Sequence, residues 1–232
     1  MKLDNYTIFA RSFPAILSGL PFVILIYFLT GYDQYKNLIA YLSNMKFYGS
    51  ITLAFIGIYA IGLIISTYAK YLEKRYFHNK KGFPTTYFML YGDKEFSSDY
   101  KDKYRAKVKK SLGLDLLNQT DEQRDEAEAI RRLNETTKQI GLKVGNGKLV
   151  KHQNVWYGFR RNVAAGSLFG FLISAISVLI GFYFLNITPM VVVSFTLLIL
   201  YAAIFLMKGY IIKSAGEECA KQLVAEFMMK NE

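Results

Sequence analysis

The chain has 232 residues, of which 52% are hydrophobic and 16% aromatic, and its mean hydropathy is positive at +0.16. The formal net charge of +11 is of the size that often indicates a nucleic-acid-binding protein, so the position of the basic residues decides its meaning. The single cysteine, Cys219, excludes an internal disulfide and gives no sign of an oxidising compartment, and a structural free thiol is its predicted role.

Two uncharged segments in the N-terminal part are each long enough to cross a bilayer. They span residues 12–32 and 47–69, and a membrane helix needs about 20 apolar residues. For the first segment a cleaved signal peptide is the alternative, but its apolar run is too long and no small-residue cleavage motif follows. A buried core helix is the alternative for both. We predict two membrane spans here.

A third apolar stretch follows the charged middle of the chain. No charged residue occurs between Arg161 and Lys208, a gap of 46 residues that is long enough for two spans. Near its middle the segment "FLNITPM" contains residues that favour a turn and end a helix. The sequence therefore predicts a hairpin of two membrane helices, at roughly 163–185 and 189–208.

The basic residues are concentrated beside the predicted membrane exits. Of the 29 Lys and Arg, 21 lie between Lys70 and Arg161, together with 12 of the 18 acids, whereas the 31–46 loop carries few charges. This asymmetry predicts that both termini and the middle segment face the cytoplasm. It also favours contact with anionic lipid over nucleic-acid binding.

The middle segment is predicted to be mainly helical. Gly82 and Pro84 should end the helix that follows the second span, and "TTYFMLYG" fits a short strand or a loop. A serine or aspartate at 97–99 can cap a helix that ends near Gly113, with an apolar stripe at i, i+4 and i+8. The residues of this stripe are Tyr100, Tyr104 and Val108.

A second helix and a hairpin are predicted further along the same segment. Thr120 and Gln123 match a capping box, and a narrow apolar stripe follows. Its residues are Ala127, Ile130, Leu133, Thr137 and Ile140. "GLKVGNGKLV" contains the Asn-Gly pair typical of a tight β-hairpin. This is too little apolar material for an independent enzyme core.

The C-terminal segment is predicted to extend the fourth span as a cytoplasmic helix. Its apolar residues recur at helical spacing and can pack against the middle domain or against another subunit. They are Ala220, Leu223, Val224 and Phe227.

The predicted fold is therefore an all-α membrane protein with four transmembrane helices and a mainly helical cytoplasmic insert between the second and third spans. The predicted domains are an N-terminal transmembrane pair (1–70), a cytoplasmic domain (71–161), a C-terminal transmembrane hairpin (162–208) and a cytoplasmic C-terminal helix (209–232).

Catalytic motifs find little support in the sequence. The two histidines, His78 and His152, are 74 residues apart and neither lies in a metal-binding spacing, and no serine lies in a nucleophile-elbow sequence. We therefore predict no enzyme activity, no metal and no cofactor. The predicted spans also contain no ionisable residue, which disfavours ion-coupled transport.

Adjacent arginines at the start of the third span are the candidate binding residues. Two neighbouring guanidinium groups can hold a phosphate or carboxylate in bidentate geometry, and two lysines at the other membrane exit can join them. The alternative is a positive-inside anchor with interfacial aromatics. The candidate residues for a ligand or partner are Arg160, Arg161, Lys80, Lys81, Trp156 and Tyr157.

Small residues on the third span indicate close helix packing. Gly166 and Gly170 form a small-xxx-small spacing. Packing within one subunit and packing between subunits both fit this pattern, and for the second we expect a homo-oligomer, with a tetramer as the leading hypothesis.

Two short motifs flank the charged insert, "KGFPTT" (81–86) and "VWYGFRRN" (155–162). With the four-span layout they resemble a group of largely uncharacterised bacterial membrane proteins that are similar to membrane effectors of anti-phage defence systems. The resemblance implies an oligomeric effector that perturbs the inner membrane after a cytoplasmic signal, either a small anionic ligand or a partner protein. The alternatives are a membrane sensor or scaffold that recruits a cytoplasmic partner, and a small channel or transporter.

Overall fold

The computed structural model describes residues 6–30, 47–78, 82–145 and 147–230. Within these ranges every regular element is a helix, as predicted. The chain divides into two compact units. The apolar unit comprises Met1–Leu72 and Gly158–Ile211, and the charged unit comprises Glu73–Tyr157 and Ile212–Glu232.

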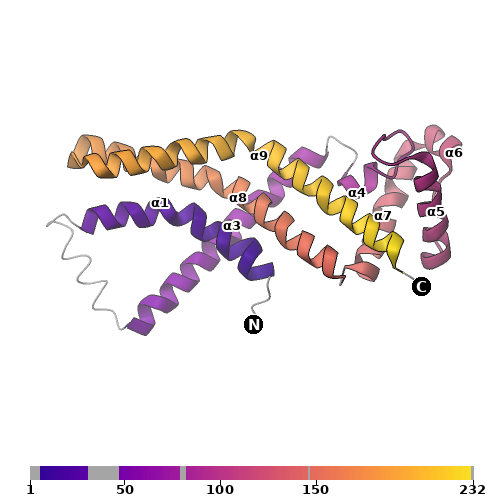
Figure 1. Cartoon of the computed structure of the whole chain (residues 1–232), viewed down its shortest axis with the longest axis horizontal. Helices are drawn as coiled ribbons and strands as arrows, with labels where there is room; N and C mark the ends of the chain where they lie inside the picture. Colours follow the sequence, from indigo (N-terminus) through magenta and orange to yellow (C-terminus); the bar gives the residue numbers. More distant parts are fainter. Residues whose placement is uncertain (1–5, 31–46, 79–81, 146, 231–232) are drawn as a thin grey trace. The chain divides into compact units, whose positions relative to one another are not determined.

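Long helices build the apolar unit (Figure 1). Its described elements are the π-helical turn η1 (Thr7–Ser12), α1 (Phe13–Thr30), most of α3 (Phe47–His78), most of α8 (Lys148–Leu179), the π-helical turn η2 (Ile180–Leu185) and the first half of α9 (Thr188–Met229). Because α8 and α9 are both uninterrupted helices, each continues from the apolar unit into the charged unit.

Three described helices are long and apolar enough to cross a membrane, which indicates a multi-pass membrane protein. They are Ile8–Leu29, Lys148–Tyr183 and Thr188–Met229. The predicted second span, 47–69, lies within α3, but the side chains of its first nine residues are outside the described part, so a total of four spans stays a prediction.

Large apolar side chains on these helices face outward. Val23 is 62% exposed, Tyr183 70% and Leu206 82%. Water-soluble proteins rarely expose contiguous apolar surface on this scale, whereas lipid-facing helices do so by necessity. The outward surface of the apolar unit therefore fits a hydrocarbon environment.

Small residues allow the helices of the apolar unit to approach closely. A Cβ atom added at Gly166 would lie 2.0 Å from Ser18 Oγ on α1 and 3.4 Å from Ile65 Cδ1 on α3. At Gly170 it would lie 2.6 Å from the ring of Tyr201 on α9. Both glycines thus pack inside one chain, and their predicted role between subunits stays a prediction. By contrast, a Cβ at Gly19 would meet no atom within 4 Å.

The turn between the predicted third and fourth spans is present. Asn186 ends η2 in the left-handed conformation at φ 51°, a region that asparagine tolerates better than most residues. Helix α9 begins two residues later at Thr188, with Pro189 in its first turn.

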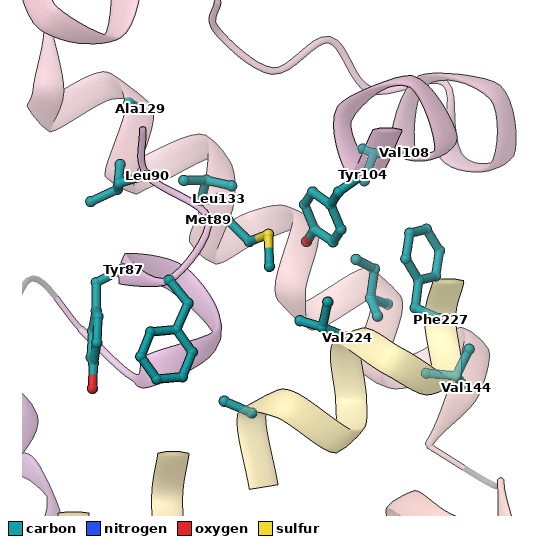
Figure 2. Packing of buried hydrophobic residues seen from close by; sticks show 13 residues of the cluster. Tyr87, Met89, Leu90, Tyr104, Val108, Ala129, Leu133, Val144, Val224 and Phe227 are labelled. Atoms are coloured by element: carbon teal, nitrogen blue, oxygen red, sulfur yellow. The ribbon is translucent and has the colours of Figure 1, made fainter. Parts of the chain in front are cut away.

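The charged unit is built around the ends of α3, α8 and α9. Its other helices are α4 (Pro84–Tyr87), α5 (Ser98–Leu112), α6 (Gln119–Arg124) and α7 (Glu126–Val144). Figure 2 shows Val224 and Phe227 of α9 lying in one apolar core with Tyr104 and Leu133. The rings of Tyr104 and Phe227 meet edge to face at 5.8 Å between centroids. Of the two contacts predicted for the C-terminal helix, the structure shows the one with the middle domain.

The predicted helix at 98–112 is also confirmed. The side chain of Ser97 caps it by accepting a hydrogen bond from the backbone N–H of Tyr100, and Gly113 ends it at φ 68°. Tyr104 and Val108 of the predicted stripe are fully buried. The capping residues and the helical spacing of the apolar residues indicate the same helix, so its two ends could be predicted from the sequence.

One local prediction in the charged unit is right only in part and another is wrong. "TTYFMLYG" is not a strand: its first three residues belong to the one-turn helix α4, and the rest is a loop of packed turns, which is the other alternative. The capping box at Thr120 is not formed. Asn118 caps α6 by accepting from the N–H of Asp121, and Asp125 then caps α7, so the predicted single helix is two.

The predicted β-hairpin at "GLKVGNGKLV" is wrong as well, since the two segments are the end of α7 and the start of α8. Gly145 and Gly147 are positions where other atoms of the chain come too close for a side chain. A Cβ at Gly145 would lie 2.2 Å from the carbonyl oxygen of Gly141, and one at Gly147 would lie 2.0 Å from the carboxylate of Glu226 on α9. Val144 and Val150, on either side, are both buried.

Three lysines cap the helix ends of the charged unit in a closed ring. Lys107 of α5 donates to the carbonyls of Met228 and Lys230 at the end of α9. Lys230 donates to the carbonyl of Lys143 at the end of α7, and Lys143 donates to that of Ser111 at the end of α5. Each ammonium group meets unsatisfied carbonyls at the negative end of a helix, so the ring ties three helices together.

Candidate functional site

A pocket of about 340 Å³ opens within the charged unit. It lies among the ends of α3, α7, α8 and α9 and the segment that leads into α4. The lining residues are Glu73, Phe83, Thr85, Thr137, Gly141, Gly145, Val150, Asn154, Tyr157, Cys219 and Leu223. A volume of this size is at the lower end of the range for small-molecule sites.

The turn after α3 places two of these residues. Gly82 adopts φ 108°, a backbone conformation that residues other than glycine rarely reach. Phe83 is then extended and Pro84 opens α4 with its fixed φ. As a result Phe83 and Thr85 both reach the pocket.

Aromatic rings form one wall of the pocket. The ring of Phe83 packs edge to face against Phe77 at 5.1 Å and against Tyr157 at 5.7 Å between centroids. Val150 and Leu223 add aliphatic surface. This wall suits a flat or aliphatic ligand body.

Two threonine hydroxyls in the pocket lack a hydrogen-bond partner within the described part of the chain. Thr85 is 3% exposed and its Oγ1 is buried without a partner, and the buried Oγ1 of Thr137 has none either. The neighbouring Thr86 shows the contrast, since its hydroxyl donates to Asn134 Oδ1 at 2.7 Å. Buried polar atoms are normally satisfied, so these two hydroxyls are exceptions within the described part of the chain.

The cysteine at the pocket wall, Cys219, has a thiol of low reactivity. Its thiol donates to Asn154 Oδ1 at 3.3 Å. Burial raises the pKa of Cys219 to about 11, and the negative charge of Glu73 adds to the rise. Because the thiolate is the nucleophile, a thiol held protonated at neutral pH does not suit covalent catalysis.

The protonated thiol leads to a prediction about alkylation. At pH 8 we expect Cys219 to react with iodoacetamide roughly a hundredfold more slowly in the folded protein than in the protein unfolded in SDS, where the thiol pKa returns to about 8.5. Since the chain has one cysteine, mass spectrometry of the labelled chain reports this site alone. Equal rates in the two states would contradict the buried, protonated thiol.

Glu73, near the end of α3, is the one Asp, Glu, Lys or Arg among the described residues that line the pocket. The charged unit as a whole is basic, with 21 Lys and Arg against 16 Asp and Glu.

A glycine leaves part of the pocket empty. Gly141 lies within α7, and a Cβ atom placed there would meet nothing within 4 Å. A larger side chain at this position projects into open space and leaves the helix backbone unstrained.

Of the six residues predicted as a site from sequence, the structure describes four, all on α8. Tyr157 lines the pocket, whereas Trp156 is 45% exposed and donates to His152 Nε2 at 3.0 Å. Arg160 and Arg161 follow on α8 but belong to the apolar unit, where Arg161 is buried. Lys80 and Lys81 lie outside the described residues. Anion binding by the two arginines stays a prediction.

Sequence reasoning missed most of the pocket. Its polar residues come from separate segments of the chain, as Glu73, Thr85 and Thr137 show. Their spacing in the sequence matches no binding motif. The one readable signal is the pair Gly141 and Gly145, which lie four residues apart at the end of α7, with Gly145 as its C-cap.

The chain matches no protein-family model, no curated protein and no solved structure. Among the described residues no group of three or more His, Cys, Asp or Glu is placed to hold a metal ion.

Proposed function

We propose that this chain is a multi-pass effector of the bacterial inner membrane, which perturbs the membrane when its cytoplasmic charged unit receives a signal. The three apolar helices support a membrane location. The pocket supports a signal that arrives as a small molecule.

The observation that carries the proposal is the continuity of α8 and α9. Helix α8 lines the pocket with Val150, Asn154 and Tyr157 and then runs without a break into an uncharged segment. Helix α9 does the same in the opposite direction, with Cys219 and Leu223 in the pocket and an uncharged first half. A ligand that favours one arrangement of these helix ends biases the helices that enter the membrane.

The defence setting of the proposal comes from the resemblance of "KGFPTT" and "VWYGFRRN" to membrane effectors of anti-phage systems. An effector of this type keeps the membrane intact until the infection signal appears. Assembly into a homo-oligomer belongs to the same proposal, because helices without charged residues that perturb a bilayer act together more readily than one subunit alone.

The test is the membrane potential of bacteria that express the chain with its neighbouring genes, followed with a potential-sensitive dye before and after phage infection. We expect a potential that is stable before infection and collapses after it. Gly170→Leu, which collides with Tyr201 in the apolar unit, should prevent the collapse, and Gly19→Leu, which points into open space, should not.

Other outcomes would contradict the effector proposal. A potential that never changes while a cytoplasmic partner co-purifies with the chain would indicate a scaffold. A potential that is unaffected while the cells take up a solute would indicate a transporter.

A further inference from the structure

We infer that Arg11, in the π-helical turn η1 of the apolar unit, binds the phosphate group of an anionic phospholipid such as phosphatidylglycerol. Lipid binding at this residue needs no signal and no pocket. It therefore goes beyond the effector proposal and is independent of it.

The guanidinium of Arg11 has nitrogen atoms available for a ligand. Among the described residues Arg11 forms no ion pair, and its Cζ lies 5.7 Å from the centroid of the Tyr6 ring. Its Nε is buried without a hydrogen-bond partner in that part of the chain, whereas the side chain as a whole is partly exposed. A ligand therefore meets the outer nitrogens, Nη1 and Nη2. The face of a ring attracts the cation but supplies no oxygen acceptor, so an oxyanion adds charge-assisted hydrogen bonds.

The depth of Arg11 fits the phosphate layer of a bilayer. Arg11 is the fourth residue of the apolar segment Ile8–Leu29, which has 22 residues. A helix of that length covers about 33 Å, slightly more than a hydrocarbon core of about 30 Å. Arg11 lies only about 4.5 Å along the helix from the end of this segment. From there a long side chain can reach the lipid phosphates.

Two phenylalanine rings mark the lipid boundary at the same turns of the helix. Phe9 is 50% exposed and Phe13 is 47% exposed, and their rings stack at 6.0 Å between centroids. Exposed phenylalanine suits the boundary between headgroups and acyl chains. The position of Arg11 between them in sequence therefore agrees with its proposed contact with headgroups.

Excess positive charge in the neighbouring segments selects an anionic lipid. Helix α8 packs on η1, since the Asn162 side-chain amide donates to the carbonyl of Ala10 and a Cβ at Gly158 would lie 2.8 Å from that of Ala10. Residues 1–12 and 158–162 together contain four Lys and Arg and a single acid, Asp4. One acid cannot neutralise four cations, whichever of them it pairs with. Such an excess favours acidic phospholipid over zwitterionic lipid.

The experiment measures lipid binding to the detergent-purified full chain by isothermal titration calorimetry, with detergent alone as the baseline. The probes are dioctanoyl phosphatidylglycerol, dioctanoyl phosphatidylcholine and dioctanoylglycerol, which share their acyl chains and differ in the headgroup. We expect saturable binding of phosphatidylglycerol, at least tenfold weaker binding of phosphatidylcholine and no saturable binding of dioctanoylglycerol. Millimolar inorganic phosphate should not displace the lipid, because the acyl chains contribute to its affinity.

Matched variants tie the binding to Arg11. Arg11→Gln removes the cation and should weaken phosphatidylglycerol binding at least fivefold. Arg11→Lys keeps the charge but loses the bidentate geometry, so its binding should lie between those of Arg11→Gln and the unmodified chain. Lys70→Gln removes an exposed cation of the same unit and should change binding by less than twofold. Unchanged circular dichroism shows that a variant is folded, and Arg11→Lys gives the decisive comparison if Arg11→Gln does not fold.

Several results would overturn the inference. Arg11→Gln, or Arg11→Lys where it replaces that variant, could bind phosphatidylglycerol like the unmodified chain. Phosphatidylcholine or dioctanoylglycerol could bind as tightly as phosphatidylglycerol, or Lys70→Gln could weaken binding as much as Arg11→Gln, which would indicate general attraction to charge. Displacement by inorganic phosphate would identify free phosphate as the ligand. The membrane potential of infected cells does not enter this test, so the effector proposal can fail while lipid binding at Arg11 holds, and the reverse.

Discussion

Replacing Glu122 by alanine is expected to lower the free energy of unfolding of the charged unit by about 3–5 kcal/mol. Glu122 Oε2 lies 2.8 Å from Arg105 Nη2, and the two side chains are only 7% and 11% exposed. The other carboxylate oxygen accepts the backbone N–H of Tyr91. Without the carboxylate, the buried guanidinium loses its ionic partner and the Tyr91 N–H loses its acceptor.

Further contacts of Arg105 show why this pair matters for the fold. Its Nε donates to the carbonyl of Leu117 at 2.9 Å, and its guanidinium lies 4.0 Å from the centroid of the Tyr91 ring. The pair therefore joins α5, α6 and the segment after α4. Losing it releases three parts of the unit together.

Thermal unfolding followed by far-UV circular dichroism checks this expectation, with Glu128→Ala as the matched control. Glu128 pairs with Arg131 and Arg132, and hydrogen bonds from these arginines lower the pKa of its carboxyl to about 2. Because that cluster is exposed to water, its loss should change the melting temperature little, whereas Glu122→Ala should lower it by roughly 10 °C. Equal melting temperatures for the two variants would contradict the structural role of the buried pair.

Gly170→Leu is expected to disrupt the packing of the apolar unit. A Cβ atom alone would lie 2.6–2.8 Å from three carbon atoms of the Tyr201 ring, and a leucine adds three more carbons. The ring cannot move aside freely, since its hydroxyl donates to the backbone carbonyl of Leu17 on α1. Overpacking of this kind costs about 1–3 kcal/mol or more. Gly166→Leu, facing Ser18 and Ile65, should have a similar effect.

Heating the purified protein in detergent, followed by size-exclusion chromatography with mass determination, checks this expectation. The temperature at which half of the folded peak is lost should fall clearly for Gly170→Leu and stay close to that of the unmodified chain for Gly19→Leu, whose side chain meets open space. If Gly170→Leu keeps the thermal stability but reduces the number of subunits, the glycine packs between subunits and the contact with Tyr201 is secondary.

The sequence predicts the long helices of this protein because their signals are both local and extended. The uncharged gap before Lys208, the turn at Asn186 and the cap at Ser97 each depend on neighbouring residues only. The C-terminal stripe could be placed for the same reason, since Val224 and Phe227 recur at helical spacing and are buried as predicted.

The errors arise where distant contacts decide the local structure. The Asn-Gly pair before Lys148 has the composition of a hairpin turn, but the approach of Glu226 from α9 explains why glycine occupies position 147. Likewise the pocket depends on α3, α7 and α9 meeting, and neither Glu73 nor Thr85 carries a sequence signal of its own. A pattern read along one segment cannot report a contact made by another.

The central claim is that the apolar unit crosses the membrane while the charged unit, with its pocket, faces the cytoplasm. Fusion of a reporter that is active only in the cytoplasm tests this most directly, at three positions: after Lys110 in α5, at Glu232 and at Asn37 between the first two predicted spans. We expect activity for the fusions at Lys110 and Glu232 and none at Asn37, because the basic residues beside the membrane exits should stay inside. Activity at Asn37 alone would reverse the orientation and place the pocket outside the cell, which would contradict a cytoplasmic signal.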